Sequence, residues 1–253
     1  GDRYYSPAVT LGDWKEYQGT CMFIDPSGRG KDETAYAITK MLNGFIHVPD
    51  AGGFQGGYEE ATLQGLAEKV RDHKVTMVLI ESNFGDGMFT QLFKPYLQKL
   101  NIQCGLEDVP SGNKQKELRI IETLEPVMNQ HRLILDQDLI ERDRLSTQHL
   151  PSEIAVRYQL MYQMSRITKD KGALSHDDRL DALCGAVKYW IDLMAQYADQ
   201  KMAQDRAQSE KDMYNLLTGK IKMSADAFAL GMPIETAKRF HRKSKRIEDD
   251  LLL

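Results

Sequence analysis

Acidic residues stand where three predicted elements begin or end, and their positions are more informative than their number. Asp25 ends a short apolar run, Glu81 ends the most apolar of the predicted strands, and Asp178 lies at the start of a predicted helix. Open α/β folds place their sites at one edge of the sheet, where strand ends and helix starts meet. We therefore expect these three carboxylates to lie close together.

The start of that helix carries two further acids, which compete with Asp178 for the same role. Asp181 follows Asp178 by three residues and Asp177 by four, so all three share one face of the helix. Acids this close repel one another unless a cation or a base lies among them. Spacing alone leaves Asp177, Asp178 and Asp181 as rivals for the third carboxylate.

The chemistry that such a group could perform follows from its ligand type. Carboxylates suit hard ions that keep part of their water, above all Mg²⁺ or Mn²⁺. Two such ions can activate a water molecule and stabilise the leaving oxygen of a phosphodiester. Simpler interpretations remain: Asp25 before Pro26 could be a turn former, and the helix acids could favour the helix dipole with Ser175 as N-cap.

The hydrophobic pattern predicts the elements that must position these residues. Strands are expected at 20–24, 34–40, 45–48, 75–80, 102–106 and 132–135. Helices are expected at 59–73, 88–100, 114–128, 151–163 and from 176 to about 198. Asn43-Gly44 predicts a hairpin turn, and the glycine-rich segment 50–57 a loop. This order predicts an α/β fold with a mixed central sheet flanked by helices.

A change in composition suggests a domain boundary near residue 199. Residues 199–213 are almost wholly polar, so we expect one domain at 1–198 and a linker with a helical or irregular tail at 199–253. The tail has a small apolar cluster at 227–230 and six lysines or arginines at 238–246. It could dock on a partner protein, which we prefer, or bind DNA phosphates.

Overall composition restricts the class of protein. The chain has 253 residues, a net charge of −4, 42% hydrophobic and 28% charged residues, as expected for a folded protein. Any DNA binding must therefore use local positive charge. The three cysteines are far apart, which argues against disulfides and zinc and suggests free thiols in a reducing cytoplasm. The chain contains no apolar run of about 18 residues, so no membrane span is expected.

Four segments, in order, resemble motifs of one family. They are DPSGRGKD at 25–32, VLIESN at 78–83, KQKELRI at 114–120 and SHDDRLDAL at 175–183. The first, second and fourth resemble the acidic motifs of the nuclease domain of large terminases from tailed, T7-like bacteriophages. The third resembles the basic helix of that family. The resemblance covers residues 20–195, and each motif alone is weak, but their order makes the set specific.

The resemblance implies a fold, an activity and a set of partners. The fold would be RNase H-like, and Asp25, Glu81 and Asp178 would hold two Mg²⁺ or Mn²⁺ ions. The activity would be endonucleolytic cutting of concatemeric, double-stranded viral DNA during genome packaging, in the cytoplasm of the infected bacterium. The portal of the procapsid and the small terminase subunit would be partners. A packaging ATPase would precede the nuclease in the same protein.

The ATPase motor itself is not expected in this chain. Residues 28–32 (GRGKD) imitate the end of a phosphate-binding loop, but Asp32 stands where Mg²⁺ binding requires Ser or Thr. The segment also lies between two predicted strands rather than before a helix. The first residue is Gly1 and not Met, which agrees with a piece of a longer protein.

Basic residues near the acids are candidates for DNA contacts. Arg29 and Lys31 could contact the phosphate that is cut, and Lys114 and Lys116 could line the DNA path. His176 could carry a proton. Each could equally be an ordinary exposed side chain of a loop or a helix start.

Two other functions fit the same acids. One is an RNase H-like resolvase or recombination nuclease, which would prefer branched DNA. The other is a non-catalytic module that docks on the portal, in which the acids are only structural. Metal-stimulated plasmid cutting separates a nuclease from a docking module, and preference for four-way junctions identifies a resolvase.

Overall fold

The computed structural model describes residues 15–27, 33–82, 87–110, 112 and 114–217, and the account below concerns these. The strands are β1 (Gly19–Asp25), β2 (Glu33–Leu42), β3 (Phe45–Gln55), β4 (Met77–Ser82), β5 (Gly105–Pro110) and β6 (Leu133–Leu135). The helices are α1 (Glu60–Asp72), α2 (Met88–Lys99), α3 (Lys116–Asn129), α4 (Leu139–Ser146), α5 (Ser152–Tyr158), α6 (Leu160–Arg166) and α7 (Asp178–Leu217).

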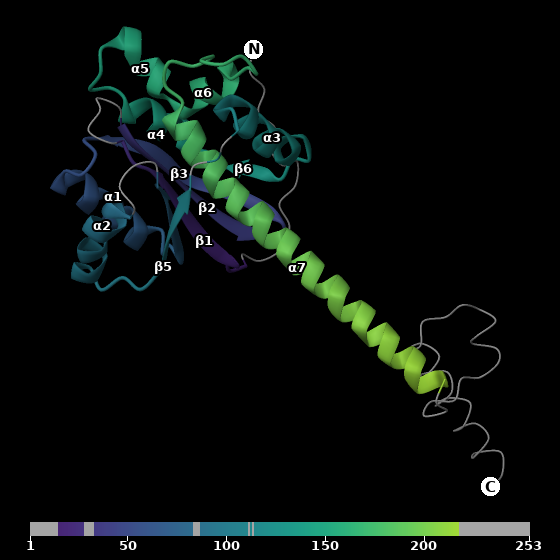
Figure 1. Ribbon diagram of the computed structural model, residues 1–253. Coiled ribbons are helices and arrows are strands. Elements are labelled where there is room, and N and C mark those ends of the chain that lie inside the picture. Colours follow the sequence, from purple (N-terminus) through teal and green to yellow (C-terminus); the bar gives the residue numbers. More distant parts are fainter. Residues whose placement is uncertain (1–14, 28–32, 83–86, 111, 113, 218–253) are drawn as a thin grey trace. The chain divides into compact units, whose positions relative to one another are not determined.

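The six strands form one mixed sheet in the order β5-β4-β1-β2-β3-β6. Strands β1, β2 and β3 are antiparallel neighbours, whereas β4 is parallel to β1, β5 to β4 and β6 to β3. Helices flank this sheet (Figure 1). The mixed sheet with flanking helices confirms the predicted fold class.

The hairpin between β2 and β3 is as predicted, but β3 is longer than the sequence suggested. Asn43 and Gly44 take positive φ angles of 51° and 82°, as a two-residue hairpin turn requires. The glycine-rich segment continues the strand to Gln55 instead of forming a loop from residue 50. A Cβ atom on Gly53 would lie 2.2 Å from Cδ of Glu33. Glycine is therefore needed at this position to make room for the Glu33 side chain.

One face of the sheet packs against α1 and α2. Alternate residues of β1, β2 and β4 point to this face and are almost fully buried, because successive strand residues face opposite sides. The core they form with the two helices includes Met22, Ile24, Ile38, Val78, Ile80, Leu66, Val70 and Phe93. The predicted helices at 59–73 and 88–100 are therefore confirmed, each to within two residues.

The first turns of α7 pack closely against the opposite face. A Cβ atom on Gly185 would lie 2.4–2.6 Å from ring atoms of Phe23, so only glycine permits this approach. Farther along the helix, Nε1 of Trp190 donates a hydrogen bond of 2.8 Å to Oγ1 of Thr39. The sheet face toward α7 is the face on which Asp25 and Glu81 lie.

Between β6 and α7 the prediction was wrong in two respects. Helix α4 was not expected, and the single helix expected at 151–163 is two helices separated at Gln159, whose backbone is extended. The second helix starts where it does because Asp143 of α4 caps it, accepting hydrogen bonds of 3.0 Å from the N–H groups of Leu160 and Met161.

Helix α7 is much longer than expected, because the polar segment after residue 198 is helical to Leu217. Contacts divide the chain into units at Gly1–Asp192 and Leu193–Leu253. The docking segments predicted at 227–230 and 238–246 lie outside the described residues. None of the described helices is both long enough and apolar enough to span a membrane.

Candidate metal centre

The pairing of two parallel strands places Asp25 beside Glu81. Ile24 of β1 is paired with Ile80 of β4 in the parallel register, so the next residues along the two strands are Asp25 and Glu81. Both follow core residues of the α1 side, and their own side chains therefore point to the α7 side. The two strand ends thus meet at one edge, as the sequence predicted.

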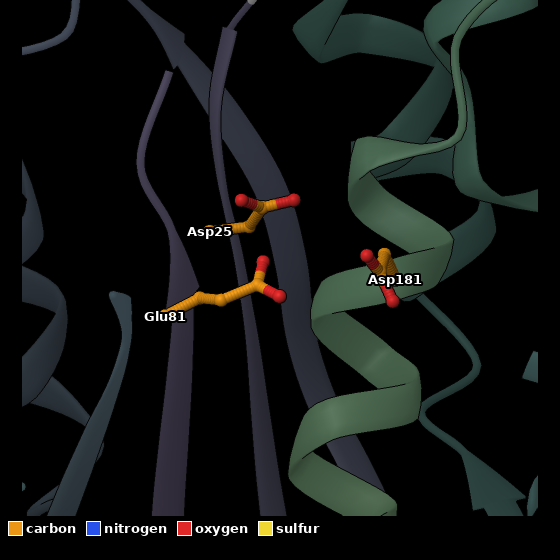
Figure 2. A group of neighbouring side chains, drawn as sticks. All are labelled: Asp25, Glu81 and Asp181. Atoms are coloured by element: carbon orange, nitrogen blue, oxygen red, sulfur yellow. The ribbon is translucent and has the colours of Figure 1, made fainter. Parts of the chain in front are cut away.

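Helix α7 supplies the third carboxylate, and it comes from Asp181. Asp181 precedes Gly185 by four residues, so it lies on the face of α7 that approaches the sheet. One carboxylate oxygen from each of Asp25, Glu81 and Asp181 lies within 4.8 Å of the others. Figure 2 shows the carboxylates of Asp25 and Glu81 directed from neighbouring strands toward the helix that carries Asp181.

Burial and mutual repulsion make this cluster costly when it is fully ionised. Asp25, Glu81 and Asp181 are only 7%, 6% and 4% exposed. Burial, followed by the charges of Glu81 and Asp181, raises the pKa of Asp25 well above its ordinary value. Burial also raises the pKa of Asp181, although Lys116 and Arg119 oppose this. In the absence of another cation, the cluster therefore retains protons that isolated carboxylates would lose.

Two cations of α3 compensate part of the negative charge. Nζ of Lys116 lies 2.8 Å from Oδ1 of Asp177 and 3.2 Å from Oδ2 of Asp181. Nη2 of Arg119 lies 2.7 Å from Oδ1 of Asp181, and its Nη1 lies 3.7 Å from Oε1 of Glu81. Burial opposes both positive charges, but the surrounding carboxylates outweigh it and raise the pKa of Lys116 and of Arg119.

The other two acids of the helix start lie beside the cluster. Asp177 is paired with Lys116, and the charge of Asp178 contributes to the raised pKa of Asp25. Neither belongs to the group whose oxygens converge within 4.8 Å. The assignment of Asp178 as the main third ligand therefore stays a prediction, and the geometry favours Asp181.

The donor set fits a hard divalent cation. All three converging side chains offer carboxylate oxygens, as Mg²⁺, Mn²⁺ and Ca²⁺ prefer, and no thiol or imidazole belongs to the group. A buried cluster of acids also needs positive charge, and two α3 side chains supply only part of it. The cluster could therefore hold a metal ion.

The remaining predicted residues have varied positions. Arg29 and Lys31 lie outside the described residues. Lys114 precedes α3, and its Nζ lies 3.2 Å from Oε2 of Glu122 on that helix, with both side chains exposed. The ring of His176 stacks on that of Tyr158, with centroids 3.9 Å apart. This contact gives it a packing role and leaves the proposed proton transfer untested.

Sequence reasoning overlooked Arg119 as a site residue. It lies three residues after Lys116, which places both cations on one face of α3. That spacing was the available signal, because the acids were expected to need a neighbouring base. The segment 114–120 was instead interpreted only as a surface that contacts DNA.

Comparisons with known proteins agree on one family. Residues 24–133 match the family model described as the ribonuclease H-like domain of the bacteriophage T7 terminase. The chain is 47% identical over 186 residues to the large terminase subunit of Enterobacteria phage T3. The aligned part covers 74% of this chain and 31% of that protein. The chain thus spans about a third of the length of that relative.

Solved nuclease domains of terminases are more distant in sequence. The human cytomegalovirus terminase nuclease domain, soaked with Mn and bound to an inhibitor, is 16% identical with a TM-score of 0.48. The match covers 68% of this chain and 82% of that one. The nuclease domain of the large terminase subunit of bacterial virus Sf6 is 12% identical with a TM-score of 0.43, covering 69% and 90%.

Proposed function

We propose that this chain, which belongs to the family of the T7 terminase ribonuclease H-like domain, cuts DNA in a reaction that depends on divalent metal ions. One observation carries the proposal. Carboxylates from two strand ends and one helix converge within 4.8 Å and are buried at one edge of the sheet. A structural role alone gives no reason to gather three buried acids that repel one another.

Each acid has a defined place in the proposed site. Asp25, Glu81 and Asp181, whose oxygens converge, would hold the metal ions. Asp178, whose charge acts on Asp25, would contribute to their binding. When bound, two Mg²⁺ or Mn²⁺ ions would activate water and stabilise charge on the leaving oxygen of the phosphodiester.

The α3 cations have a complementary role in the proposal. The side chains of Lys116 and Arg119 are 35% and 22% exposed, so solvent and substrate reach them more readily than the buried acids. From there they can attract the phosphate group of the substrate and reduce its repulsion by the acids. They also keep Asp181 and Glu81 in place before metal binds.

The substrate and partners follow from the family. The substrate would be double-stranded concatemeric DNA, cut as a viral genome is packaged in the cytoplasm of the infected bacterium. A packaging ATPase domain of the same protein, the procapsid portal and the small terminase subunit would be the partners. These assignments are part of the proposal, because the chain spans about a third of the relative's length.

The test is cutting of a supercoiled plasmid with Mg²⁺ or Mn²⁺ and with EDTA. We expect metal-dependent cutting without sequence preference, and a loss of about 100-fold or more in Asp25→Ala. Asp50→Asn is the matched control. Asp50 is equally buried, 4% exposed, and its Oδ2 lies 2.7 Å from Nζ of Lys69, but it lies outside the acidic cluster.

Other results would point to the two alternatives. An intact protein that does not cut with either metal would support a non-catalytic docking module. Strong preference for a four-way junction over a linear duplex would support a resolvase. Cutting by Asp25→Ala at the unsubstituted rate would contradict the assignment of the site.

A further inference from the structure

A buried arginine lies within the same helical turn as the acids of α7. Arg179 is 1% exposed, and its guanidinium is held by two parallel hydrogen bonds. Nε donates to Oε1 of Glu33 at 2.6 Å, and Nη2 donates to Oε2 at 2.9 Å. Glu33 is the first residue of β2, so this pair joins the start of α7 to the sheet.

The third nitrogen of the same guanidinium extends the connection to α4. Nη1 of Arg179 donates to Oδ1 of Asp143 and to Oγ of Ser146, both at 2.8 Å. Asp143 is itself 1% exposed and also caps α6 through the N–H groups of Leu160 and Met161. One side chain of α7 is thus fixed directly to β2 and α4, and through Asp143 to α6.

Helix α6 returns a second contact to the same turn. Gln163, which is fully buried, accepts a hydrogen bond of 3.0 Å at Oε1 from the backbone N–H of Leu180. The start of α7 is therefore fixed twice, by the side chain of Arg179 and by the backbone of the next residue. Both contacts depend on elements whose presence or boundaries the sequence pattern did not reveal.

These contacts bear on the acids because of helix geometry. Successive residues of an α-helix are rotated by about 100°, so Arg179 points away from the face shared by Asp178 and Asp181. A guanidinium fixed at three corners prevents rotation of the turn about the helix axis. We propose that Arg179 is a positioning residue, which fixes the rotation of α7 so that Asp181 reaches Asp25 and Glu81. The inference rests on the proposed metal-dependent function.

A purely stabilising role is the competing explanation. Replacing a buried ion pair by apolar residues is often neutral for stability, so stability alone is a weak reason for a buried cluster of this kind. Residues that orient metal ligands, in contrast, change metal affinity when substituted, by about 10- to 100-fold where they contact the ligand directly. The two explanations therefore differ in whether metal affinity changes beyond what a loss of stability would cause.

The test is a titration of the whole chain with Mn²⁺ in the absence of DNA, with free Mn²⁺ followed by electron paramagnetic resonance. Arg179→Lys retains the charge but cannot make the paired contact with Glu33 while also reaching Asp143. Glu33→Gln retains the shape and removes the charge. These variants are preferred to Arg179→Met, because that substitution would leave the buried carboxylates of Glu33 and Asp143 without this partner and could unfold the chain.

Trp190→Phe is the matched control, because it removes a buried hydrogen bond between the same helix and the same sheet. We expect Arg179→Lys and Glu33→Gln to weaken Mn²⁺ binding by about 10- to 100-fold. Trp190→Phe should lower the melting temperature and leave Mn²⁺ affinity unchanged.

Two outcomes would overturn the inference in different ways. If Arg179→Lys and Glu33→Gln lower the melting temperature but bind Mn²⁺ as the unsubstituted chain does, Arg179 only stabilises the fold, and the proposed function is unaffected. If the unsubstituted chain does not bind Mn²⁺, or if Asp25→Ala does not remove that binding, the proposed function fails and the inference fails with it.

Discussion

Nη2 of Arg119 lies 2.7 Å from Oδ1 and 2.8 Å from Oδ2 of Asp181, so a cation of α3 contacts both oxygens of a carboxylate in the acidic cluster. Nε of the same guanidinium is buried and has no hydrogen-bond partner within the described part of the chain. Arg119 is therefore held at the cluster by the hydrogen bonds of Nη2 to Asp181 and by the ion pair of Nη1 with Glu81. A metal ion bound at the proposed site would have to share Asp181 with Arg119 or displace it.

The first prediction concerns this competition. Arg119→Gln removes a positive charge beside three carboxylates, which should lower the stability of the metal-free chain and increase its affinity for Mn²⁺. Thermal melts with and without Mn²⁺ measure both effects, and the stabilisation by Mn²⁺ should be larger in the variant. If Arg119→Gln binds Mn²⁺ more weakly than the unsubstituted chain, Arg119 orients Asp181 rather than competing with metal.

The second prediction ranks the acids of α7. Asp181→Asn should reduce plasmid cutting by orders of magnitude, because its oxygens belong to the converging group. Asp178→Asn should retain more activity and show its effect mainly as a higher Mn²⁺ requirement. Circular dichroism checks that both variants are folded. Should Asp178→Asn be the more damaging of the two, the original assignment from sequence is correct.

Two of the three converging acids could be predicted from sequence because their positions depend on local rules. A strand alternates its two faces, and a parallel partner in register brings the neighbouring strand end alongside, so Asp25 and Glu81 had to meet. The choice between Asp178 and Asp181 depends on how α7 is rotated. That rotation is set by Gly185 against Phe23 and by long-range contacts, which no local pattern contains.

The incorrect boundaries have the same kind of cause. The glycine-rich end of β3 resembles a loop by composition, but Gly53 is needed to accommodate the side chain of Glu33 from the paired strand. The break at Gln159 depends on Asp143, which caps α6 from 17 residues away. In both cases a partner distant in sequence overrides the local preference of the chain.

The third prediction concerns pH. The pKa of Asp25 is raised in the folded chain, chiefly by burial, so the native state holds a proton that the unfolded chain releases near the ordinary value of 3.8. The contribution of Asp25 to stability is therefore present below pH 3.8 and is lost as pH rises through the raised pKa. Denaturant unfolding of the metal-free chain across this pH range should show that stability falls less with rising pH in Asp25→Asn than in the unsubstituted chain.

Asp50→Asn provides a control of opposite sign. Burial alone would raise the pKa of Asp50, but hydrogen bonds from His73 and Lys69 outweigh it and lower this pKa. Asp50 therefore contributes stability above its ordinary pKa that is lost as pH falls through the lowered value. If Asp25→Asn and the unsubstituted chain have parallel pH profiles, the Asp25 carboxyl does not hold this proton.

The fourth prediction separates Lys116, the first residue of α3, from Lys114, which precedes the helix. Lys114 is 75% exposed, and its ion pair with Glu122 contributes little, so it is free to contact a phosphate. Lys114→Gln should reduce the salt slope of duplex binding by about one and leave Mn²⁺ affinity unchanged. Lys116→Gln should change both, because Lys116 contacts Asp177 and Asp181.

Binding is measured by fluorescence anisotropy of a labelled duplex at several salt concentrations. Ca²⁺ replaces Mg²⁺ so that cutting does not interfere. An unchanged salt slope for Lys114→Gln would identify Lys114 as an ordinary exposed residue of a helix start.

The last prediction concerns the C-terminal part of the chain. Trp190 is the last buried hydrophobic residue of α7 among those described, and from Asp192 onward the described side chains other than Asp212 are exposed or half-buried. Deletion of residues 199–253 should therefore leave the melting temperature and plasmid cutting near those of the full chain. If the basic residues at 238–246 bind DNA instead of a partner protein, the truncated chain will need more DNA for half-maximal cutting, increasingly so at high salt. If the truncated chain unfolds, both interpretations of the tail are wrong and the segment belongs to the folded core.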